Sequence, residues 1–289
     1  MPFSLRTKFP EIRSRLGILA TLRRHCVTGI LRHNTTTGSI MSISRKLFLP
    51  LLTASLLFSA CDSGSEDDSE LSITDLKIGD GEAVQTKTTI IISWEGRLPD
   101  GTVFDSSELR GLDLIFTLGV GKVIAGLDEG ILGMHVGGKR RIEIPPQKAF
   151  GRSGSCLEDG ACPVPGNTTV TYEVEVLSIM TEVAIDEREE GEGVAAKTGD
   201  KIWVEYIGAS QAGIVFDSSE QHGGPLEFTL GAGQVIEGWD RGITGMKIGG
   251  VRILTIPPML AYGSNSNGPI TPWSVIIFRV ELVAIIDQG

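Results

Sequence analysis

Apolar and polar residues alternate along several short stretches of this chain, a pattern typical of β-strands with one buried face. In Val170–Ile179 every second residue from Val170 to Val176 is apolar, so these side chains share a face. Lys139–Ile144 alternates charged and apolar residues in the same way. Thr88–Ser93 is rich in apolar β-branched residues, which favour strands. These stretches predict strands of an antiparallel sheet.

One stretch between the predicted strands favours a short helix instead. Gly126 opens Leu127–Met134, and the glycine-rich Val136–Gly138 stops it. Pro99–Thr102 contains the Asp-Gly dipeptide expected of a tight hairpin, and Leu112–Leu118 predicts a further strand. Several antiparallel strands with one helix place this part of the chain in the α+β class.

The same pattern occurs a second time at a constant offset of 112 residues. The offset holds for the pairs Trp94/Tyr206, Phe104/Phe216, Val123/Val235, Met134/Met246, Pro145/Pro257 and Gly151/Gly263. A constant offset indicates one domain present twice, with no insertion or deletion over that span. We therefore predict domain 1 over residues 73–180 and domain 2 over residues 181–289.

The second copy repeats the predicted elements of the first. Its strands and helix are expected at Lys201–Tyr206, Leu226–Leu230, Trp239–Met246 (the helix), Val251–Ile256 and Ser274–Val283. The junction Thr181–Glu192 contains a charged run and is interpreted as solvated surface. The loop Gly263–Trp273, here named the domain 2 flap, is expected to hang over one end of the sheet.

The offset falls to 106 residues between Tyr172 and Phe278, so domain 1 carries six extra residues. They lie in the loop that contains Cys156 and Cys162. We favour a structural disulfide between these two cysteines, as expected in an oxidising compartment. A redox pair and a set of metal ligands are the alternatives. The chain has only four histidines and none is near these cysteines, so no metal site is predicted.

Charge is distributed unevenly along the chain, whose net charge is −10. Residues 1–60 hold nine of the 26 Lys and Arg residues and one of the 36 acidic residues. The remainder is strongly acidic, which disfavours nucleic-acid binding because that function normally requires a basic face. With 41% hydrophobic and 21% charged residues, the composition is that of a globular protein of about two domains.

Residues 41–60 have the pattern of a secretory signal peptide. Arg45 and Lys46 precede the apolar run Leu47–Leu57, and small residues precede Cys61. The segment resembles a bacterial lipoprotein signal, which implies a lipidated Cys61; a plain signal peptide and an uncleaved anchor are the alternatives. Residues 1–40 fit no such pattern and are interpreted as a non-native extension, or else as a second, Arg-rich targeting segment. Residues 61–72 are predicted to form a flexible acidic tether.

Candidate chemistry is restricted to aromatic side chains and one carboxylate. No Gly-x-Ser-x-Gly element or Cys/His pair is present, and the Gly231–Gly233 turn lacks the Walker lysine of a nucleotide site. The remaining residues are consistent with either a hydrophobic core or a ligand pocket. They are Tyr206, Phe216, Asp217, Val235, Ile236, Trp239, Tyr262 and Phe278.

The order of these residues resembles that of FKBP-type peptidyl-prolyl cis-trans isomerases. Five motifs occur in sequence: Tyr206–Gly208, Phe216–Ser219, Val235–Trp239, Ala261–Gly263 and Phe278–Leu282. The resemblance covers both copies, about 210 residues. It implies two half-barrels, each a twisted antiparallel sheet wrapped around one short helix with a pocket between them. It also implies isomerase chemistry that needs no cofactor and no metal.

The resemblance assigns a role to each of the eight residues. Trp239 is expected to form the pocket floor, and Tyr206, Phe216, Val235, Ile236 and Phe278 the walls. The Ile236 backbone N–H and the Tyr262 hydroxyl would bind substrate carbonyls, and Asp217 would shape the field near the twisting amide. Leu226 replaces an aromatic wall residue of the family, and His222 replaces a basic partner of the pocket carboxylate.

The first copy departs further from the family pattern. Its weaker site comprises Trp94, Phe104, Asp105, Val123, Ile124, Leu127, Phe150 and Tyr172. Leu127 replaces the floor tryptophan, and Phe150 lacks the hydroxyl that Tyr262 supplies. Domain 2 is therefore expected to be the catalyst, and domain 1 a weaker enzyme or a substrate-binding module.

The functional expectation is a peptidyl-prolyl cis-trans isomerase in the bacterial cell envelope. It would be lipid-anchored at Cys61, face the periplasm and act on X-Pro bonds of exported proteins. Proline-containing polypeptides are the expected partners, and the macrolide inhibitors of the family are candidate ligands. The alternatives are a chaperone that binds proline-containing segments without catalysis, and a scaffold.

Overall fold

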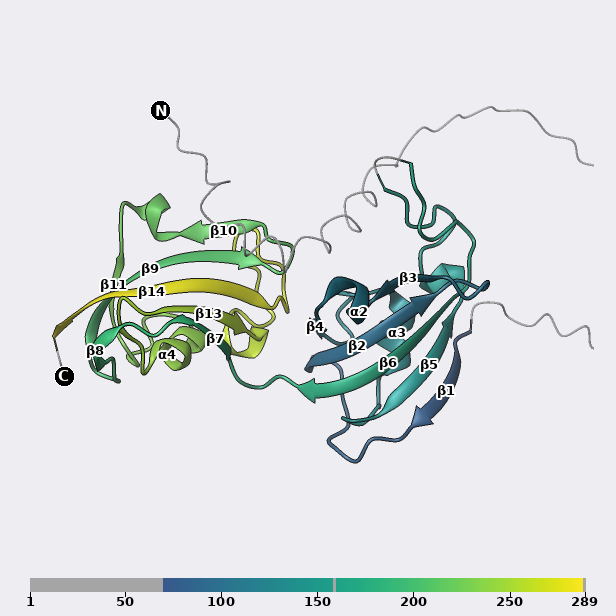
Figure 1. Cartoon of the computed structure of the whole chain (residues 1–289), viewed down its shortest axis with the longest axis horizontal. Coiled ribbons are helices and arrows are strands. Elements are labelled where there is room, and N and C mark those ends of the chain that lie inside the picture. Colours follow the sequence, from purple (N-terminus) through teal and green to yellow (C-terminus); the bar gives the residue numbers. More distant parts are fainter. Residues whose placement is uncertain (1–69, 158–159, 288–289) are drawn as a thin grey trace, which may run out of the picture.

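Two antiparallel sheets, each curved around one short helix, form the architecture of this chain (Figure 1). The computed structural model describes residues 70–157 and 160–287. The predicted α+β class with two half-barrel domains is confirmed. The predictions for residues 1–40, for the signal peptide and for Cys61 lie outside the described residues, as does most of the acidic tether.

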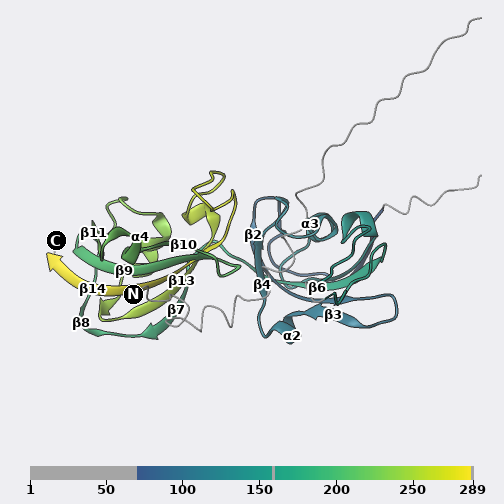
Figure 2. The same cartoon turned by 90° about the horizontal axis from the view of Figure 1, so that it is seen from above.

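The sheet of domain 1 has six strands in the order β1-β5-β6-β2-β3, with β4 also paired to β2. The strands are β1 (Ser72–Lys77), β2 (Thr89–Arg97), β3 (Val103–Ser106), β4 (Leu114–Thr117), β5 (Lys139–Ile144) and β6 (Val170–Ile179). The helices are α2 (Ser107–Arg110), α3 (Ala125–Ile131) and the 3₁₀ turn η2 (Pro146–Lys148). Seen from above, α3 lies within the curve of the sheet (Figure 2).

The sheet of domain 2 has the equivalent order β7-β13-β14-β9-β10, with β11 also paired to β9. The strands are β7 (Ala184–Glu189), β9 (Lys201–Ser210), β10 (Val215–Ser218), β11 (Leu226–Thr229), β13 (Val251–Ile256) and β14 (Ile276–Asp287). A small separate sheet pairs β8 (Glu192–Ala195) with β12 (Lys247–Ile248). The helices are the 3₁₀ turns η3 (Ser219–His222) and η4 (Pro258–Leu260), and α4 (Glu237–Ile243).

Glycines allow each helix to pack directly against its sheet. In α3, a Cβ on Gly126 would lie 2.2 Å from the Cγ2 atom of Ile144 on β5. In α4, a Cβ on Gly238 would lie 2.4 Å from the Cγ2 atom of Ile256 on β13. Both distances are shorter than any carbon–carbon contact allows. The helices therefore approach their sheets closely only because these positions carry no side chain.

The helices begin and end earlier than predicted. The sequence predicted Leu127–Met134, whereas α3 ends at Ile131. Leu132 leaves the helical conformation with ψ 133°, and Gly133 follows with φ 76°, a left-handed value that glycine adopts easily. The prediction of Trp239–Met246 for α4 is wrong for the same reason, because Gly245 has φ 85°.

The junction Thr181–Glu192 is not simply solvated surface. It contains β7, whose side chains are mostly exposed but whose backbone pairs with β13. Glu187 on β7 accepts a hydrogen bond of 2.8 Å from Arg252 on β13. In domain 1 the unpredicted strand β1 occupies the equivalent edge, and Asp75 accepts from Arg140 at 2.6 Å. Each domain therefore closes one edge of its sheet with an added, ion-paired strand.

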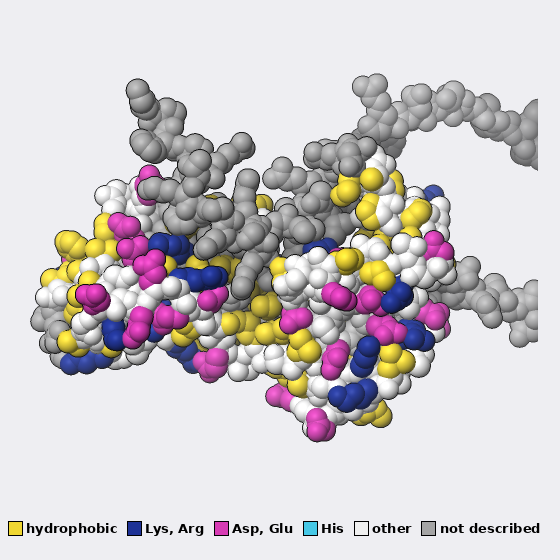
Figure 3. Space-filling view, in the orientation of Figure 1, with side chains coloured by type: hydrophobic (Ala, Val, Ile, Leu, Met, Phe, Trp, Pro, Cys, Tyr) yellow, Lys and Arg dark blue, Asp and Glu magenta, His cyan; other side chains and the backbone are white. Residues whose placement is uncertain are grey.

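The exposed surface carries both signs of charge close together. On the face shown in Figure 3, acidic and basic side chains are interspersed over both domains. Glu173 on β6 illustrates this, because it bonds both Arg141 (2.7 Å) and Lys139 (3.1 Å) of the neighbouring strand. In the part of the chain that the structure describes, no helix is long and apolar enough to cross a bilayer.

Candidate functional site

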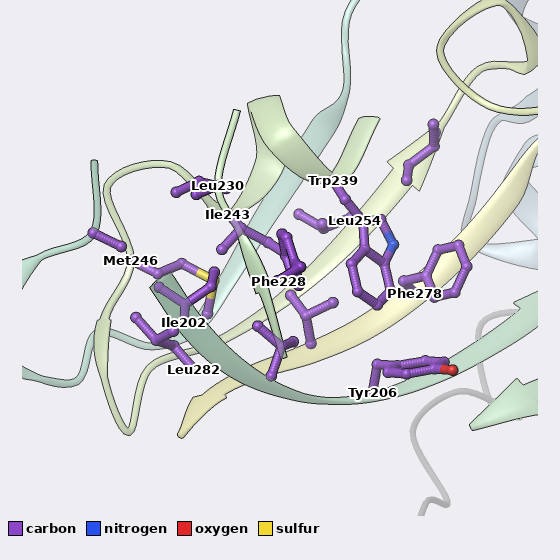
Figure 4. Packing of buried hydrophobic residues seen from close by; sticks show 14 of the residues in the cluster. Ile202, Tyr206, Phe228, Leu230, Trp239, Ile243, Met246, Leu254, Phe278 and Leu282 are labelled. Atoms are coloured by element: carbon purple, nitrogen blue, oxygen red, sulfur yellow. The ribbon is translucent and has the colours of Figure 1, made fainter. Parts of the chain in front are cut away.

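The candidate pocket of domain 2 is a cluster of aromatic side chains on different elements. Tyr206 lies on β9, Phe216 on β10, Trp239 on α4 and Phe278 on β14. Tyr206, Trp239 and Phe278 are at most 7% exposed, and Phe216 is partly buried against them. Figure 4 shows the side chains of Tyr206, Trp239 and Phe278 converging at one end of the core. The fold thus brings together residues that are separated by up to 72 positions in the chain.

Trp239 lies at the centre of this aromatic cluster. Its ring centroid lies 4.9 Å from that of Tyr206 and 5.1 Å from that of Phe278, both in edge-to-face geometry. Aromatic rings prefer this arrangement because their edges and faces carry opposite partial charges. Within the described residues, the buried Trp239 Nε1 atom has no hydrogen-bond partner. The indole is therefore packed among other rings, and its N–H donor is unpaired within the described residues.

The glycine of the Tyr-x-Gly motif allows the walls to meet. Gly208 on β9 pairs with Phe278 on β14, and a Cβ there would lie 2.6 Å from the Phe278 ring and 2.7 Å from that of Phe216. These two rings pack edge to face at 5.6 Å. Val235, Ile236 and Tyr262 are partly buried against the same cluster. All seven predicted apolar and aromatic residues of the domain 2 site therefore lie together.

Asp217 is the carboxylate at the edge of the pocket. Its Oδ2 atom accepts a hydrogen bond of 3.0 Å from the Tyr206 hydroxyl. Its Oδ1 atom lies 2.7 Å from Nε2 of His222 and accepts a hydrogen bond from the Ser218 backbone N–H. His222 therefore occupies the position of the basic partner, although its side chain is 63% exposed.

The Tyr206 hydroxyl is held in its protonated form. Burial raises the pKa of Tyr206 well above its usual value, and the hydrogen bond to Asp217 and the charge of that carboxylate raise it further. A phenol that stays protonated can keep donating to Asp217. The pair therefore fixes a carboxylate beside the aromatic box without placing a second charge inside it.

The equivalent cluster of domain 1 has different residues at the matching positions. Trp94, Leu127 and Tyr172 are buried, and Phe104 packs edge to face against Tyr172 at 5.6 Å and Phe150 at 5.9 Å. Val123 and Ile124 are partly buried against the same cluster. The eight residues predicted for this site are Trp94, Phe104, Asp105, Val123, Ile124, Leu127, Phe150 and Tyr172, and the structure brings them together.

The carboxylate of domain 1 is held more firmly than that of domain 2. Both oxygens of Asp105 accept hydrogen bonds from Arg110, at 2.5 and 2.6 Å. The Arg110 guanidinium also lies 5.7 Å from the centroid of the Trp94 ring, a cation–π contact. Burial raises the pKa of Tyr172, and the charge of Asp105 raises it further.

Three lining residues were missed by sequence reasoning. Phe228 on β11 packs 5.9 Å from Trp239, and Ile270 in the domain 2 flap is only 6% exposed and belongs to the same cluster. Val164 takes the equivalent place in domain 1 at 1% exposure. Ile270 and Val164 are single apolar residues within polar, glycine- and proline-rich loops. That isolation is the only sequence signal that could have identified them.

The extra loop of domain 1 contains a disulfide between Cys156 and Cys162. Ser155 and Val164 form a backbone bridge close to it, with a hydrogen bond of 2.8 Å from the Ser155 N–H to the Val164 carbonyl. The cross-link therefore lies on the same loop that inserts Val164 into the core. Residues 70–157 and 160–287 contain no cluster of three or more His, Cys, Asp or Glu residues that could hold a metal ion.

Comparison with known proteins identifies the family. The model of the FKBP-type peptidyl-prolyl cis-trans isomerases matches residues 80–177 and 192–283. Peptidyl-prolyl cis-trans isomerase FKBP10 of Mus musculus is 36% identical over 197 residues, which cover 66% of this chain and 33% of the mouse protein. FK506-binding protein 4 of Neurospora crassa is 50% identical over 109 residues, which cover 38% of this chain and 23% of that protein.

Among solved structures, that of the three FKBP domains of wheat FKBP73 is 31% identical. The match covers 77% of this chain and 97% of the wheat chain, with a TM-score of 0.36. This chain spans about a third of the length of the mouse FKBP10 and human FKBP9 proteins that it matches. With two family domains in tandem, the chain belongs to the FKBP-type peptidyl-prolyl cis-trans isomerases.

Proposed function

We propose that domain 2 catalyses cis-trans isomerisation of X-Pro peptide bonds. The observation that carries this proposal is the aromatic box with Trp239 as its floor and two polar groups, Asp217 and Tyr262, beside it. A proline ring is compact and apolar, so it suits such a box. Among the described residues, none bonds the Tyr262 hydroxyl, which leaves this group to bind a substrate carbonyl.

The chemistry requires no nucleophile. Rotation about an X-Pro amide is opposed by resonance, with a barrier of about 18–20 kcal/mol, and takes on the order of 10–100 s without catalysis. The twisted amide is less charge-separated than the planar one, so an apolar pocket disfavours the planar ground state. Contacts that fit only the twisted geometry then lower the barrier further.

Polar groups at the pocket edge would hold the substrate backbone. The Ile236 N–H lies at the start of α4, where backbone donors are not used by the helix itself. Together with the Tyr262 hydroxyl it would bind carbonyls on either side of the proline. Asp217, fixed by Tyr206 and His222, would set the electrostatic field near the rotating amide.

For domain 1 we propose binding with weaker catalysis or none. Leu127 replaces the floor tryptophan and leaves a smaller aromatic surface beneath a proline ring. Phe150 stands where Tyr262 stands in domain 2, so no hydroxyl is available there to hold a carbonyl. The box itself is intact, because Phe104 contacts both Phe150 and Tyr172.

The proposed cellular setting is the bacterial cell envelope. The proposal rests on the signal-like segment 41–60 with Cys61 as lipid acceptor, and on residues 61–72 as a tether. The disulfide between Cys156 and Cys162 is consistent with an oxidising compartment. The clients would be exported proteins with X-Pro bonds, and family macrolides remain candidate inhibitors. The division at residues 180/181 would separate the two domains.

The test is the isomerisation rate of a short X-Pro peptide with the full chain and single variants. Tyr262→Phe and Asp217→Ala are each expected to lower kcat/KM about fivefold to thirtyfold, since each removes one contact worth about 1–2 kcal/mol. Phe104→Leu, in the wall of the other pocket, is expected to change it less than twofold. Parent-like rates for both domain 2 variants would contradict the assignment to domain 2.

A further inference from the structure

The domain 2 flap (residues 263–273) is fixed at its base and at its tip by its own backbone. The Trp273 N–H donates to the Gly263 carbonyl at 2.7 Å and closes the loop. Near the tip, Asn267 and Ile270 exchange two backbone hydrogen bonds, of 3.0 and 2.9 Å. This turn directs Ile270 into the core beside the pocket aromatics. The flap thus carries one lining residue, and the adjacent Tyr262 carries another.

The outer side of the flap contacts domain 1. The Lys122 ammonium donates to the Thr271 hydroxyl at 2.8 Å and to the Ser274 hydroxyl at 3.0 Å. These hydroxyls also lie 2.9 Å from each other, so the lysine closes a three-membered polar cluster. In Figure 2 the yellow-green loop before β14 extends toward β2 and β4 of domain 1. Thr271 directly follows Ile270, so holding one constrains the other.

Two further contacts join the two domains, one at the end of the flap and one outside it. The Lys87 ammonium lies 5.5 Å from the centroid of the Trp273 ring, within cation–π range. Trp273 has φ 57°, a left-handed value that is unusual for a bulky residue and that the surrounding contacts must hold. The Gln211 side-chain amide, directly after β9, donates to the Ile115 carbonyl of β4 at 2.7 Å.

The two domains stabilise their equivalent loops by different means. The loop of domain 1 has a covalent cross-link, Cys156–Cys162. Domain 2 has no cysteine, and its flap is rich in glycine, asparagine and serine, which have a large conformational entropy to lose. In domain 2, hydrogen bonds from Lys122 of domain 1 restrain the end of the flap instead. A flap that is already ordered in the free protein loses less conformational entropy when the substrate binds.

From this geometry we infer that Lys122 of domain 1 is a positioning residue for the pocket of domain 2, acting through Thr271 on the flap and through Ser274, which directly follows the flap. Lys122 immediately precedes Val123 and Ile124, which line the pocket of domain 1. The rim of one pocket thus supports the flap of the other. The inference deepens the proposed function and rests on it for its kinetic readout.

The test compares Lys122→Met and Lys122→Arg in the full chain, with Lys139→Met as matched control. Lys139 also belongs to domain 1 but pairs with Glu173 within its own sheet. Lys122→Met is expected to raise KM for an X-Pro peptide about threefold to tenfold with little change in kcat, because the unheld flap must be ordered at binding. Lys122→Arg retains the donors and is expected to remain within about twofold of the parent.

Hydrogen exchange provides a readout confined to domain 2. The Asn267 and Ile270 amides, which bond each other's carbonyls, are expected to exchange faster in Lys122→Met and at the parental rate in Lys139→Met. An unchanged KM, or a raised KM with unchanged exchange, would overturn the inference. So would a Lys122→Arg variant that behaves like Lys122→Met. Absence of isomerase activity in the parent would instead contradict the proposed function, and the exchange rates would still decide whether Lys122 holds the flap.

Discussion

In domain 2 the pocket carboxylate is hydrogen-bonded by a phenol and contacts an exposed imidazole. In domain 1 both oxygens of the equivalent carboxylate are hydrogen-bonded by one arginine. Asp217 contacts Tyr206 and His222, and Asp105 contacts Arg110, which in turn lies over Trp94. Arg110 is 10% exposed and His222 is 63% exposed. The same backbone therefore supports a closed, bidentate ion pair in one copy and a more open pair in the other.

This difference is consistent with the different tasks proposed for the two domains. A carboxylate neutralised by a bidentate arginine contributes little field to a neighbouring amide, and it stiffens the wall that carries Phe104. A carboxylate held by a neutral phenol and an exposed histidine retains more of its field at the pocket edge. Domain 2 also has the hydroxyl of Tyr262, which domain 1 lacks at Phe150.

The largest effect is expected when the buried ion pair of domain 1 is broken. Arg110→Ala removes both bonds to Asp105 and the contact with Trp94, and should destabilise domain 1 by about 2–4 kcal/mol, because it leaves a partly buried carboxylate unpaired. His222→Ala should cost domain 2 less than about 1 kcal/mol, since its pair is exposed. Chemical denaturation followed by hydrogen exchange on β6 and β14 measures each domain in the full chain.

Equal losses in those two variants would contradict the comparison. An Arg110→Lys variant serves as a control, because lysine retains the charge but cannot form two parallel bonds. It is expected to recover only part of the lost stability. Full recovery would show that charge alone, rather than bidentate geometry, holds Asp105.

A smaller effect is expected from reducing the disulfide of domain 1. Cys156 and Cys162 close a loop with a sequence separation of 6. Chain-entropy arguments for so short a loop give about 2 kcal/mol of stabilisation. Reduction, or Cys156→Ser with Cys162→Ser, should destabilise domain 1 by that amount and leave domain 2 unchanged. Domain-resolved hydrogen exchange with and without reductant measures both, and a matching loss in domain 2 would show that the loops are not independently held.

The smallest effect on the stability of domain 1 is expected when the pH is lowered. The hydrogen bond from Arg141 is the main cause that holds the pKa of Glu173 below its usual value. Burial opposes this effect, and the hydrogen bond from Lys139 and the charges of both cations lower the pKa further. The folded pKa is the lower one, so the stabilisation is complete above the unfolded value and is lost as the pH falls through the folded value. In domain 2 the equivalent position is Arg279, and Val251 and Ile253 replace the two cations.

Because Glu173 is near the surface, its contribution is expected to be only a few tenths of a kcal/mol after solvent screening. Glu173→Gln should remove that part of the acid sensitivity of domain 1. The measurement is the unfolding midpoint of domain 1 between about pH 3 and pH 7. Glu175→Gln, the same chemical change on the same strand, is the control. Identical pH profiles for the two variants would argue against a role for the Glu173 cluster.

The central strands could be predicted from sequence because one face of each is buried. The alternation in Val170–Ile179 corresponds to β6, in which Val170, Tyr172, Val174 and Val176 are all buried. The edge strands β1 and β7 have almost no buried side chains, so no alternation marks them. The positions of β1 and β7 are set by backbone pairing with β5 and β13. The local residue pattern does not reveal this pairing.

The site was predictable to the extent that its residues lie in ordered motifs. Trp239, Phe216 and Tyr206 stand in such motifs, and the fold brings them together. Ile270 and the contacts of Lys122 could not be predicted, because both depend on how a polar loop folds back or meets another domain. Lys122 contacts Thr271 across 149 positions of sequence.

Strand β7 has a consequence for anyone who divides this protein into fragments. The family match for the second domain begins at residue 192, after β7 has ended at Glu189. A fragment that starts there would uncover the backbone donors and acceptors of β13 from Val251 to Thr255 along one whole side. Unpaired edges of this kind associate with strands of other molecules. Such a fragment is expected to self-associate at concentrations at which a fragment that begins at residue 181 stays monomeric.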